Sequence, residues 1–251
     1  MEKEESVIDA ESLTFRELNE LVYHAATIDK VDYLKLENVN GQRYIGTGLK
    51  DVKLKIDVFG TPGQDLAAFM RGPTIEIFGN TQDGVGNTMD AGEIIIHGNI
   101  GDIAGYGMRG GEILAQGNGG YRIGIHMKEY HNKKPVIIIG GSVGDFCGEY
   151  MAGGTIIVLG MNRKNGSPVG EWVGTGMHGG KIFIRGKVTE DQLGVGTKMH
   201  VAKEQDMKKV ESTLQKFSTL FGIPLEKLLD GEFIVVKPVS HRPFAGLYML
   251  G

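Results

Sequence analysis

The stretch that decides the fold runs from residue 79 to residue 108 and reads GNTQDGVGNTMDAGEIIIHGNIGDIAGYGM. It holds two copies of one pattern, because the Gly-Asn pair at 79–80 returns at 98–99 and the Gly-x-x-Met at 86–89 returns at 105–108. Both elements return after 19 residues. Self-similarity at a fixed period indicates a repeat architecture, in which each copy is one structural unit that stacks on the next.

The same two elements, the glycine of the Gly-Asn pair and the methionine with a small residue three positions before it, occur seven times between residues 51 and 200. A methionine closes each copy, at intervals of 19, 19, 19, 24, 26 and 22 residues: Met70, Met89, Met108, Met127, Met151, Met177 and Met199. A small residue stands three positions before each methionine: Ala67, Gly86, Gly105, Gly124, Gly148, Gly174 and Gly196. We predict that these residues form the corners of the repeat.

Between its anchors, each copy carries a short segment of alternating β-branched residues, such as Ile75 and Ile77 or Ile94 and Ile96. Alternation with a period of two indicates a half-buried strand. A unit of 19 residues with one strand is too short for a strand–helix–strand crossover, and it fits one turn of a parallel β-helix. We therefore predict a mainly β protein whose body is a right-handed parallel β-helix of about seven turns. Glycines would serve its corners, and the methionines would fill its interior as a column.

The N-terminal flank of the repeat predicts a cap, because the ends of a solenoid expose unpaired strand edges. Residues 14–27 indicate a helix, since Thr14 and Glu17 form a capping box ahead of an apolar face. Residues 33–45 contain Asn40-Gly41 between two apolar runs and indicate a hairpin.

The C-terminal flank also predicts a cap. Residues 202–221 indicate a helix with one apolar face, Pro224 opens a short second helix, and residues 233–236 indicate a strand. We thus divide the chain into three parts: an N-terminal helix-and-hairpin cap (1–50), the β-helix (51–200) and a C-terminal helical cap with a strand (201–251).

The composition limits the classes of function. One cysteine among 251 residues excludes a disulfide framework and any zinc or iron–sulfur site built from several thiolates. A net charge of −4 without a basic run argues against nucleic-acid binding. No apolar stretch approaches the roughly 18 residues of a membrane span, and the first residues lack the pattern of a secretion signal. We expect a cytoplasmic protein that binds neither nucleic acid nor a membrane.

Polar residues recur within the repeat. Asn80, Asn99 and Asn118 each follow a strand-end glycine and predict a ladder of stacked amides. Aspartates recur six positions before the methionines, at 83, 102 and 145, which indicates turn chemistry rather than a catalytic carboxylate pair.

No motif predicts a reaction centre. The tracts at 105–110 and 174–179 match G-x-G-x-x-G, but they are repeat corners without the following helix that a dinucleotide site needs. Cys147 occupies a column filled elsewhere by Val, Ile and Ala, so we expect a buried small hydrophobe. Phe146 and Trp172 lie in equivalent turns outside the interior column, where they either contact a partner protein or cover a loop. We predict no catalytic, cofactor-binding or metal-binding residue in this chain.

The tract from residue 144 to residue 160, GDFCGEYMAGGTIIVLG, resembles the C-terminal domain of the glutamate synthase large subunit, the GXGXG domain. Residues 60–69, GTPGQDLAAF, resemble the segment that leads into the same domain, and residues 233–238 are a weaker match to its terminal strand. The resemblance covers residues 50–200. A free-standing domain of this size is similar to the split glutamate synthases, whose large chain is divided among separate polypeptides.

The resemblance implies a non-catalytic scaffold that packs between a glutaminase (amidotransferase) subunit and a flavin-dependent synthase subunit and helps to form the ammonia passage in glutamate biosynthesis. It also implies that FMN and an iron–sulfur cluster are bound by the synthase partner and not by this chain. Two alternatives stay open. The β-helical scaffold of formylmethanofuran dehydrogenase shares the GXGXG repeat, and a solitary ligand- or carbohydrate-binding β-helix is a third possibility.

Overall fold

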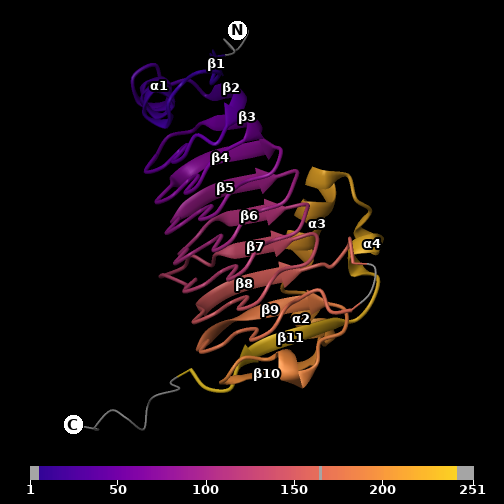
Figure 1. Ribbon diagram of the computed structural model, residues 1–251. Helices are drawn as coiled ribbons and strands as arrows, with labels where there is room; N and C mark the ends of the chain where they lie inside the picture. The colour runs from indigo at the N-terminus through magenta and orange to yellow at the C-terminus, as the bar shows by residue number, and fades with distance from the viewer. Residues whose placement is uncertain (1–5, 164–165, 242–251) are drawn as a thin grey trace, which may run out of the picture.

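The computed structural model describes residues 6–163 and 166–241, and its body is one stack of strands (Figure 1). A single sheet holds the strands in the order β1-β2-β3-β4-β5-β6-β7-β8-β9-β11-β10. Their bounds are β1 (Ser6–Asp9), β2 (Tyr33–Asn40), β3 (Lys55–Thr61), β4 (Arg71–Phe78), β5 (Ala91–Ile96), β6 (Glu112–Ala115), β7 (Val136–Ile139), β8 (Ala152–Val158), β9 (Gly179–Arg185), β10 (Thr197–Val201) and β11 (Phe233–Pro238).

Each strand from β1 to β8 pairs in parallel with the next, so that β1 to β9 form a continuous parallel ladder. Between strands the chain turns through corners and returns one level lower, so that it forms a parallel β-solenoid of about six turns. The predicted mainly β parallel β-helix is confirmed, with about six turns in place of about seven. Its strands are in register because the repeat aligns like with like, as in the column Ile75, Ile94, Ile113, Ile137, Ile156 and Ile182.

The interior of the stack is aliphatic. The inward residues of the strands and the corner methionines form one continuous buried cluster. This is the shared core that single repeats cannot build alone, because each turn has too little apolar surface to bury without its neighbours.

The last copy of the repeat departs from this arrangement. Gly196 lies in the turn before β10, Met199 belongs to β10, and Val195 is 84% exposed, because β10 runs antiparallel to β11 instead of continuing the coil.

The N-terminal end is covered by α1 (Phe15–Thr27), whose capping box of Thr14 and Glu17 is present as predicted. Leu18 and Val22 on this helix join the interior cluster. The chain does not form the predicted hairpin over residues 33–45. Instead β2 pairs in parallel with β1 and β3, and Ile45 and Leu49 after it build the first corner, because they take the places that later turns give to their apolar residue and methionine.

The C-terminal segment covers the side of the stack and closes its far end. The predicted helix over 202–221 is broken into α2 (Glu204–Met207) and α3 (Glu211–Phe221), and α4 (Leu225–Leu229) follows. Figure 1 shows α3 and α4 beside the middle strands. There Leu214 and Phe217 of α3 pack on outward-facing residues of the sheet in a second apolar cluster. The end itself is closed by β11, which inserts antiparallel between β9 and β10.

None of the helices in the described part of the chain has the length and apolar character that crossing a bilayer requires.

Candidate interaction surfaces

Each corner of the repeat is built from alternating left-handed residues. Positions five, three and one before the methionine all have positive φ, as at Ile103 (52°), Gly105 (70°) and Gly107 (59°). The middle position faces the interior, where a Cβ on Gly105 would lie 2.4 Å from Cδ1 of Ile137. Glycine is therefore required there for space as well as for conformation. The remaining predicted corner glycines of the coil take the same left-handed conformation: Gly86, Gly124, Gly148 and Gly174.

The corner methionines lie inside the stack. All are at most 1% exposed: Met70, Met89, Met108, Met127, Met151 and Met177. Cys147 is also buried, as predicted, and burial raises the pKa of its thiol to about 12. A thiol with that pKa stays protonated at neutral pH and is a poor nucleophile. Within residues 6–163 and 166–241, no three His, Cys, Asp or Glu side chains gather as a metal site would require.

Side chains at and beside the outer positions of the corners form a mainly aromatic, partly exposed surface that we call the corner ridge. It consists of Ile103, Tyr106, Tyr121, Arg122, His126, Phe146, Tyr150 and Trp172.

Two ring stacks order the corner ridge. Phe146 stacks on Trp172 with 4.8 Å between the ring centroids, and the guanidinium of Arg122 lies 4.7 Å from the centre of the Phe146 ring. His126 stacks on Tyr150 at 5.2 Å. The predicted outside position of Phe146 and Trp172 matches the structure, and Trp172 is 45% exposed. Arg122, His126 and Tyr150 were not predicted as surface candidates, although the rings that recur one position before the methionine, at Phe69, His126 and Tyr150, were a signal for the last two.

Several ridge residues hold a backbone conformation that suits glycine. Phe146, Trp172 and Tyr150 have φ of 61°, 56° and 51°, and the equivalent positions of other turns are Gly84 and Gly176. A bulky residue in the left-handed region is strained, and β-branched Ile103 at 52° even more so. Such strain persists only where the surrounding structure imposes it, and it is typical of functional sites.

Carboxylates line one flank of the ridge. The Asp83 side chain accepts a hydrogen bond from the backbone N–H of Asp102 at 2.9 Å, and Asp102 accepts one from Tyr121 at 2.8 Å. Asp145 accepts one from the N–H of Glu171 at 2.9 Å. These bonds join successive turns, so the aspartates have the turn role that their repetition indicated. In the described residues, neither these three aspartates nor the Glu171 side chain forms an ion pair with a Lys or Arg.

The asparagines form a ladder of a related kind. Oδ1 of Asn80 accepts from the backbone N–H of Asn99 at 2.8 Å, and Oδ1 of Asn99 accepts from that of Asn118 at 2.8 Å. The predicted ladder is present, but each amide bonds to the next backbone instead of to the next amide.

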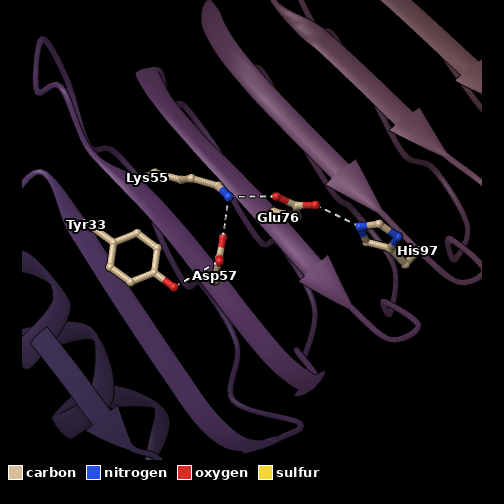
Figure 2. Close-up of polar contacts among 5 residues, drawn as sticks. All are labelled: Tyr33, Lys55, Asp57, Glu76 and His97. Atoms are coloured by element: carbon tan, nitrogen blue, oxygen red, sulfur yellow. Dashed lines mark hydrogen bonds and ion pairs between the residues drawn. The ribbon is translucent and has the colours of Figure 1, made fainter. Parts of the chain in front are cut away.

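A second surface lies on the outer face of strands β2 to β4 and just after β5, where Lys55 is exposed and Asp57 is buried (Figure 2). Its polar side chains are linked in a row. The Tyr33 hydroxyl donates to Asp57 at 3.0 Å, and Lys55 lies 3.1 Å from Asp57 and 2.9 Å from Glu76. The other Glu76 oxygen lies 2.8 Å from Nε2 of His97. We call these five residues the sheet-face network.

The sheet-face network shifts the protonation of its members. Burial acts to raise the pKa of Glu76, but hydrogen bonds from His97 and Lys55 outweigh it and hold the pKa below its usual value. Burial likewise acts to lower the pKa of Lys55, and bonds to Glu76 and Asp57 outweigh it and raise the pKa. The network is thus a set of charges that satisfy one another.

The network meets the aromatic residues at the strand ends. His97 stacks on Phe78 at 4.8 Å, and Phe78 stacks on Phe59 at 4.6 Å. Phe221 at the end of α3 contacts His97 edge-on at 5.3 Å. The mixed outward residues of the strands were visible in the sequence, but this network was not foreseen, because pairings across turns depend on the register.

A family model described as the GXGXG motif matches residues 19–239 of the chain. The uncharacterized protein MJ1350 of Methanocaldococcus jannaschii is 46% identical over 253 residues, which cover 98% of this chain and 97% of that protein.

A solved structure is also similar. It is a chain of the X-ray crystal structure of the formyltransferase/hydrolase complex (FhcABCD) from Methylorubrum extorquens in complex with methylofuran. The TM-score is 0.63 at 24% identity, and the match covers 90% of this chain and 88% of that one. At this identity the likeness shows the fold alone.

Proposed function

The chain belongs to the GXGXG motif family, and we propose that it is the non-catalytic scaffold subunit of a glutamate synthase assembled from separate polypeptides. In this proposal it packs between a glutaminase subunit, which releases ammonia, and a synthase subunit that holds FMN and an iron–sulfur cluster. It helps to form the ammonia passage between them. The assembly would work in the cytoplasm.

The observation that carries the proposal is the family match over residues 19–239, the family of the C-terminal domain of the glutamate synthase large subunit. The structure is consistent with a holding role. The interior of the coil is filled by aliphatic side chains, and its cysteine is buried with a raised pKa. Meanwhile aromatic and charged groups are displayed in ordered rows on the outside.

Reconstitution tests this role. The glutaminase and synthase subunits would be purified separately, and glutamine-dependent oxidation of the reductant with 2-oxoglutarate would be measured with and without this chain. We expect coupled turnover only when this chain is present, and no turnover by this chain alone. Full coupled activity without it, or robust activity of the chain by itself, would contradict the proposal.

A second candidate is a scaffold role in a complex of the formyltransferase/hydrolase kind, the class that also includes the formylmethanofuran enzymes. The observation that favours it is the fold match to a chain of such a complex over 90% of this chain. Mass spectrometry of the assembly purified from its own cells separates the two candidates. Glutaminase and flavin-binding partners support the first, and formyltransferase or hydrolase partners support the second.

A further inference from the structure

We propose that the corner ridge is the docking surface of this chain, and that it inserts into an apolar hollow of a partner protein whose rim carries Lys and Arg. This inference deepens the proposed function, on which it rests for the existence of a partner. It adds which surface is used and what chemistry the partner must present.

The backbone conformation of the ridge favours a role in binding. The outer corner positions, five and one before the methionine, have positive φ throughout the coil, whether they hold glycine, as at Gly84, Gly107 and Gly176, or another residue, as at Asp65, Phe69 and Thr88. In the turns between, the same positions hold large side chains with φ of 51–61°: Ile103, Arg122, His126, Phe146, Tyr150 and Trp172. Replacing glycine by large side chains at left-handed positions is unfavourable for the isolated fold. The large side chains of the ridge are therefore held at a cost to the isolated fold, and contact with a partner is a gain that offsets this cost.

The residue types of the ridge favour a protein partner. Trp, Tyr and Arg are the residues that most often dominate the energy of a protein interface. Here Trp172 and Tyr150 are 45% and 44% exposed, and each is already ordered by a stacked neighbour. Arg122 is held by Glu149, with 3.0 Å between Nε and Oε2. Side chains that are ordered before binding lose less conformational entropy on binding, so they gain more affinity from the same contact.

The negative charge along the flank of the ridge indicates what kind of partner binds there. Four carboxylates lie along it without an ion-pair partner among the described residues: Asp83, Asp102, Asp145 and Glu171. The charge of Arg122 on the ridge is already balanced by Glu149. A second copy of the chain facing this flank across a two-fold axis would place like charges together, which is unfavourable. A rim of Lys and Arg on a different protein complements it.

The shape of the ridge agrees with this occupant. Four hollows of the described surface are lined by residues of α1 with residues 44–49, by residues 10–14 and 38–42, by residues 26–32 and 51–53, and by residues at α2, β10 and β11. The residues of the corner ridge line none of these four hollows, and five of them have large apolar or aromatic side chains that are 37–52% exposed: Ile103, Tyr106, Tyr121, Tyr150 and Trp172. A projecting aromatic surface buries area when it enters a hollow of its partner.

Radical footprinting of the intact assembly tests the inference. The tagged chain would be isolated with its partners from its own cells, and side-chain oxidation would be read by mass spectrometry in the assembly and in the free chain. We expect oxidation of Tyr106, Tyr121, Tyr150 and Trp172 to fall at least fivefold in the assembly. The partner peptides that become protected in the same comparison should carry Lys and Arg beside apolar residues.

Variants provide the second readout. Trp172→Ala should weaken partner retention at least tenfold, and Glu171→Lys should weaken it more at low salt than at high salt. Matched controls are Tyr23→Ala on α1 and Glu226→Lys on α4, which replace exposed residues outside the ridge. Circular dichroism and thermal unfolding show that each variant is folded, and the footprint of the unaltered chain does not depend on them.

The outcomes separate this inference from the proposed function. An assembly with glutaminase and synthase subunits in which the ridge stays fully reactive overturns the inference and leaves the proposed function standing. A buried ridge in an assembly with other, identified subunits supports the inference and overturns the proposed function. A ridge buried between two copies of this chain, or a chain recovered alone, overturns the inference.

Discussion

The sheet-face network and the corner ridge both contain stacked rings, but the carboxylates of the two surfaces have different kinds of partner. On the sheet face Lys55 forms ion pairs with both Asp57 and Glu76, and His97 lies within hydrogen-bonding distance of Glu76. On the ridge flank the aspartates bond to backbone N–H groups of the next turn. The charged groups of the sheet-face network are already paired with one another, so this surface needs no partner protein to neutralise them. This difference is why we propose the ridge, and not the sheet face, as the surface that a partner covers.

The outer face of the sheet also has a charged part and an apolar part, which can be followed along one column of residues paired across the strands. Lys35, Asp57 and Glu76 occupy it in the first turns, and from Ile95 onward it becomes apolar. The apolar members continue through Leu114, Ile138, Ile157 and Phe183 and are covered by α3. The chain therefore covers its own apolar half and leaves a charged half that needs no cover.

The largest expected effect lies beneath the ridge, at Gly105. A Cβ there would lie 2.4 Å from Ile137 Cδ1 at a φ of 70°. Gly105→Val should therefore lower the free energy of unfolding by about 2–6 kcal/mol through strain and overpacking. Gly107→Ala is the matched control, because it has a similar φ of 59° but its nearest neighbour, Oγ1 of Thr88, is 3.6 Å away.

Urea unfolding measures both variants. Gly107→Ala should lose only about 1–2 kcal/mol, the penalty of the left-handed conformation alone. Equal losses for the two variants would show that the inward position is not crowded and that the side chains at the corner are arranged differently.

The next effect compares one carboxylate from each surface. Glu76→Ala removes the shared partner of Lys55 and His97 and should destabilise the chain by about 1–3 kcal/mol. Glu171→Ala, which removes a carboxylate without an ion pair among the described residues, should change stability by less than about 0.5 kcal/mol. Thermal or urea unfolding would give both values. A reversed order would remove the distinction between the two surfaces.

The pH dependence of the same network is a smaller effect. The pKa of Glu76 is lower in the folded chain than its ordinary value of 4.5, so the ionised carboxylate favours folding. This stabilisation is present above pH 4.5 and is lost as the pH falls through the lower pKa of the folded state. The stability difference between the unaltered chain and Glu76→Gln, from urea unfolding at about pH 7 down to about pH 3, should therefore shrink below the ordinary pKa. A difference that grows on acidification would contradict the assigned bonds.

The smallest expected effect is a difference in chemical accessibility between the ridge and the interior directly behind it. Cys147 follows the ridge residue Phe146, yet it is fully buried and the pKa of its thiol is raised to about 12. Iodoacetamide at about pH 8 should leave it unmodified in the folded chain and label it after unfolding in urea. Mass spectrometry reads the label, and rapid labelling of the folded chain would show that the corner is open.

The repeat made the coil predictable, because Ile75, Ile94 and their equivalents recur in phase with the corner glycines. In the last copy, Gly196 and Met199 keep the sequence spacing of the repeat, but the chain there does not form another turn of the coil. There β11, which follows only after α2, α3 and α4, competes for the edge of β9 as an antiparallel strand. Local spacing contains no information on such a long-range pairing.

The two surfaces were predictable to different degrees. Phe146 and Trp172 could be placed outside from their column alone. The pairings of Tyr33 with Asp57 and of Glu76 with His97 join residues 24 and 21 positions apart, so they follow only once the register is known. The predicted hairpin at residues 33–45 failed for a related reason, because Asn40-Gly41 has the composition of a hairpin turn but here opens a corner.

The most direct test of the central claim, that this chain holds two reaction centres together, is the fate of the ammonia between them. Glutamine labelled with ¹⁵N in its amide would be supplied to the glutaminase and synthase subunits in a pool of unlabelled ammonium. With this chain present, we predict that the new glutamate keeps the ¹⁵N label, and without it that the label is diluted to the level of the pool. Equal retention of the label with and without the chain would contradict the claim.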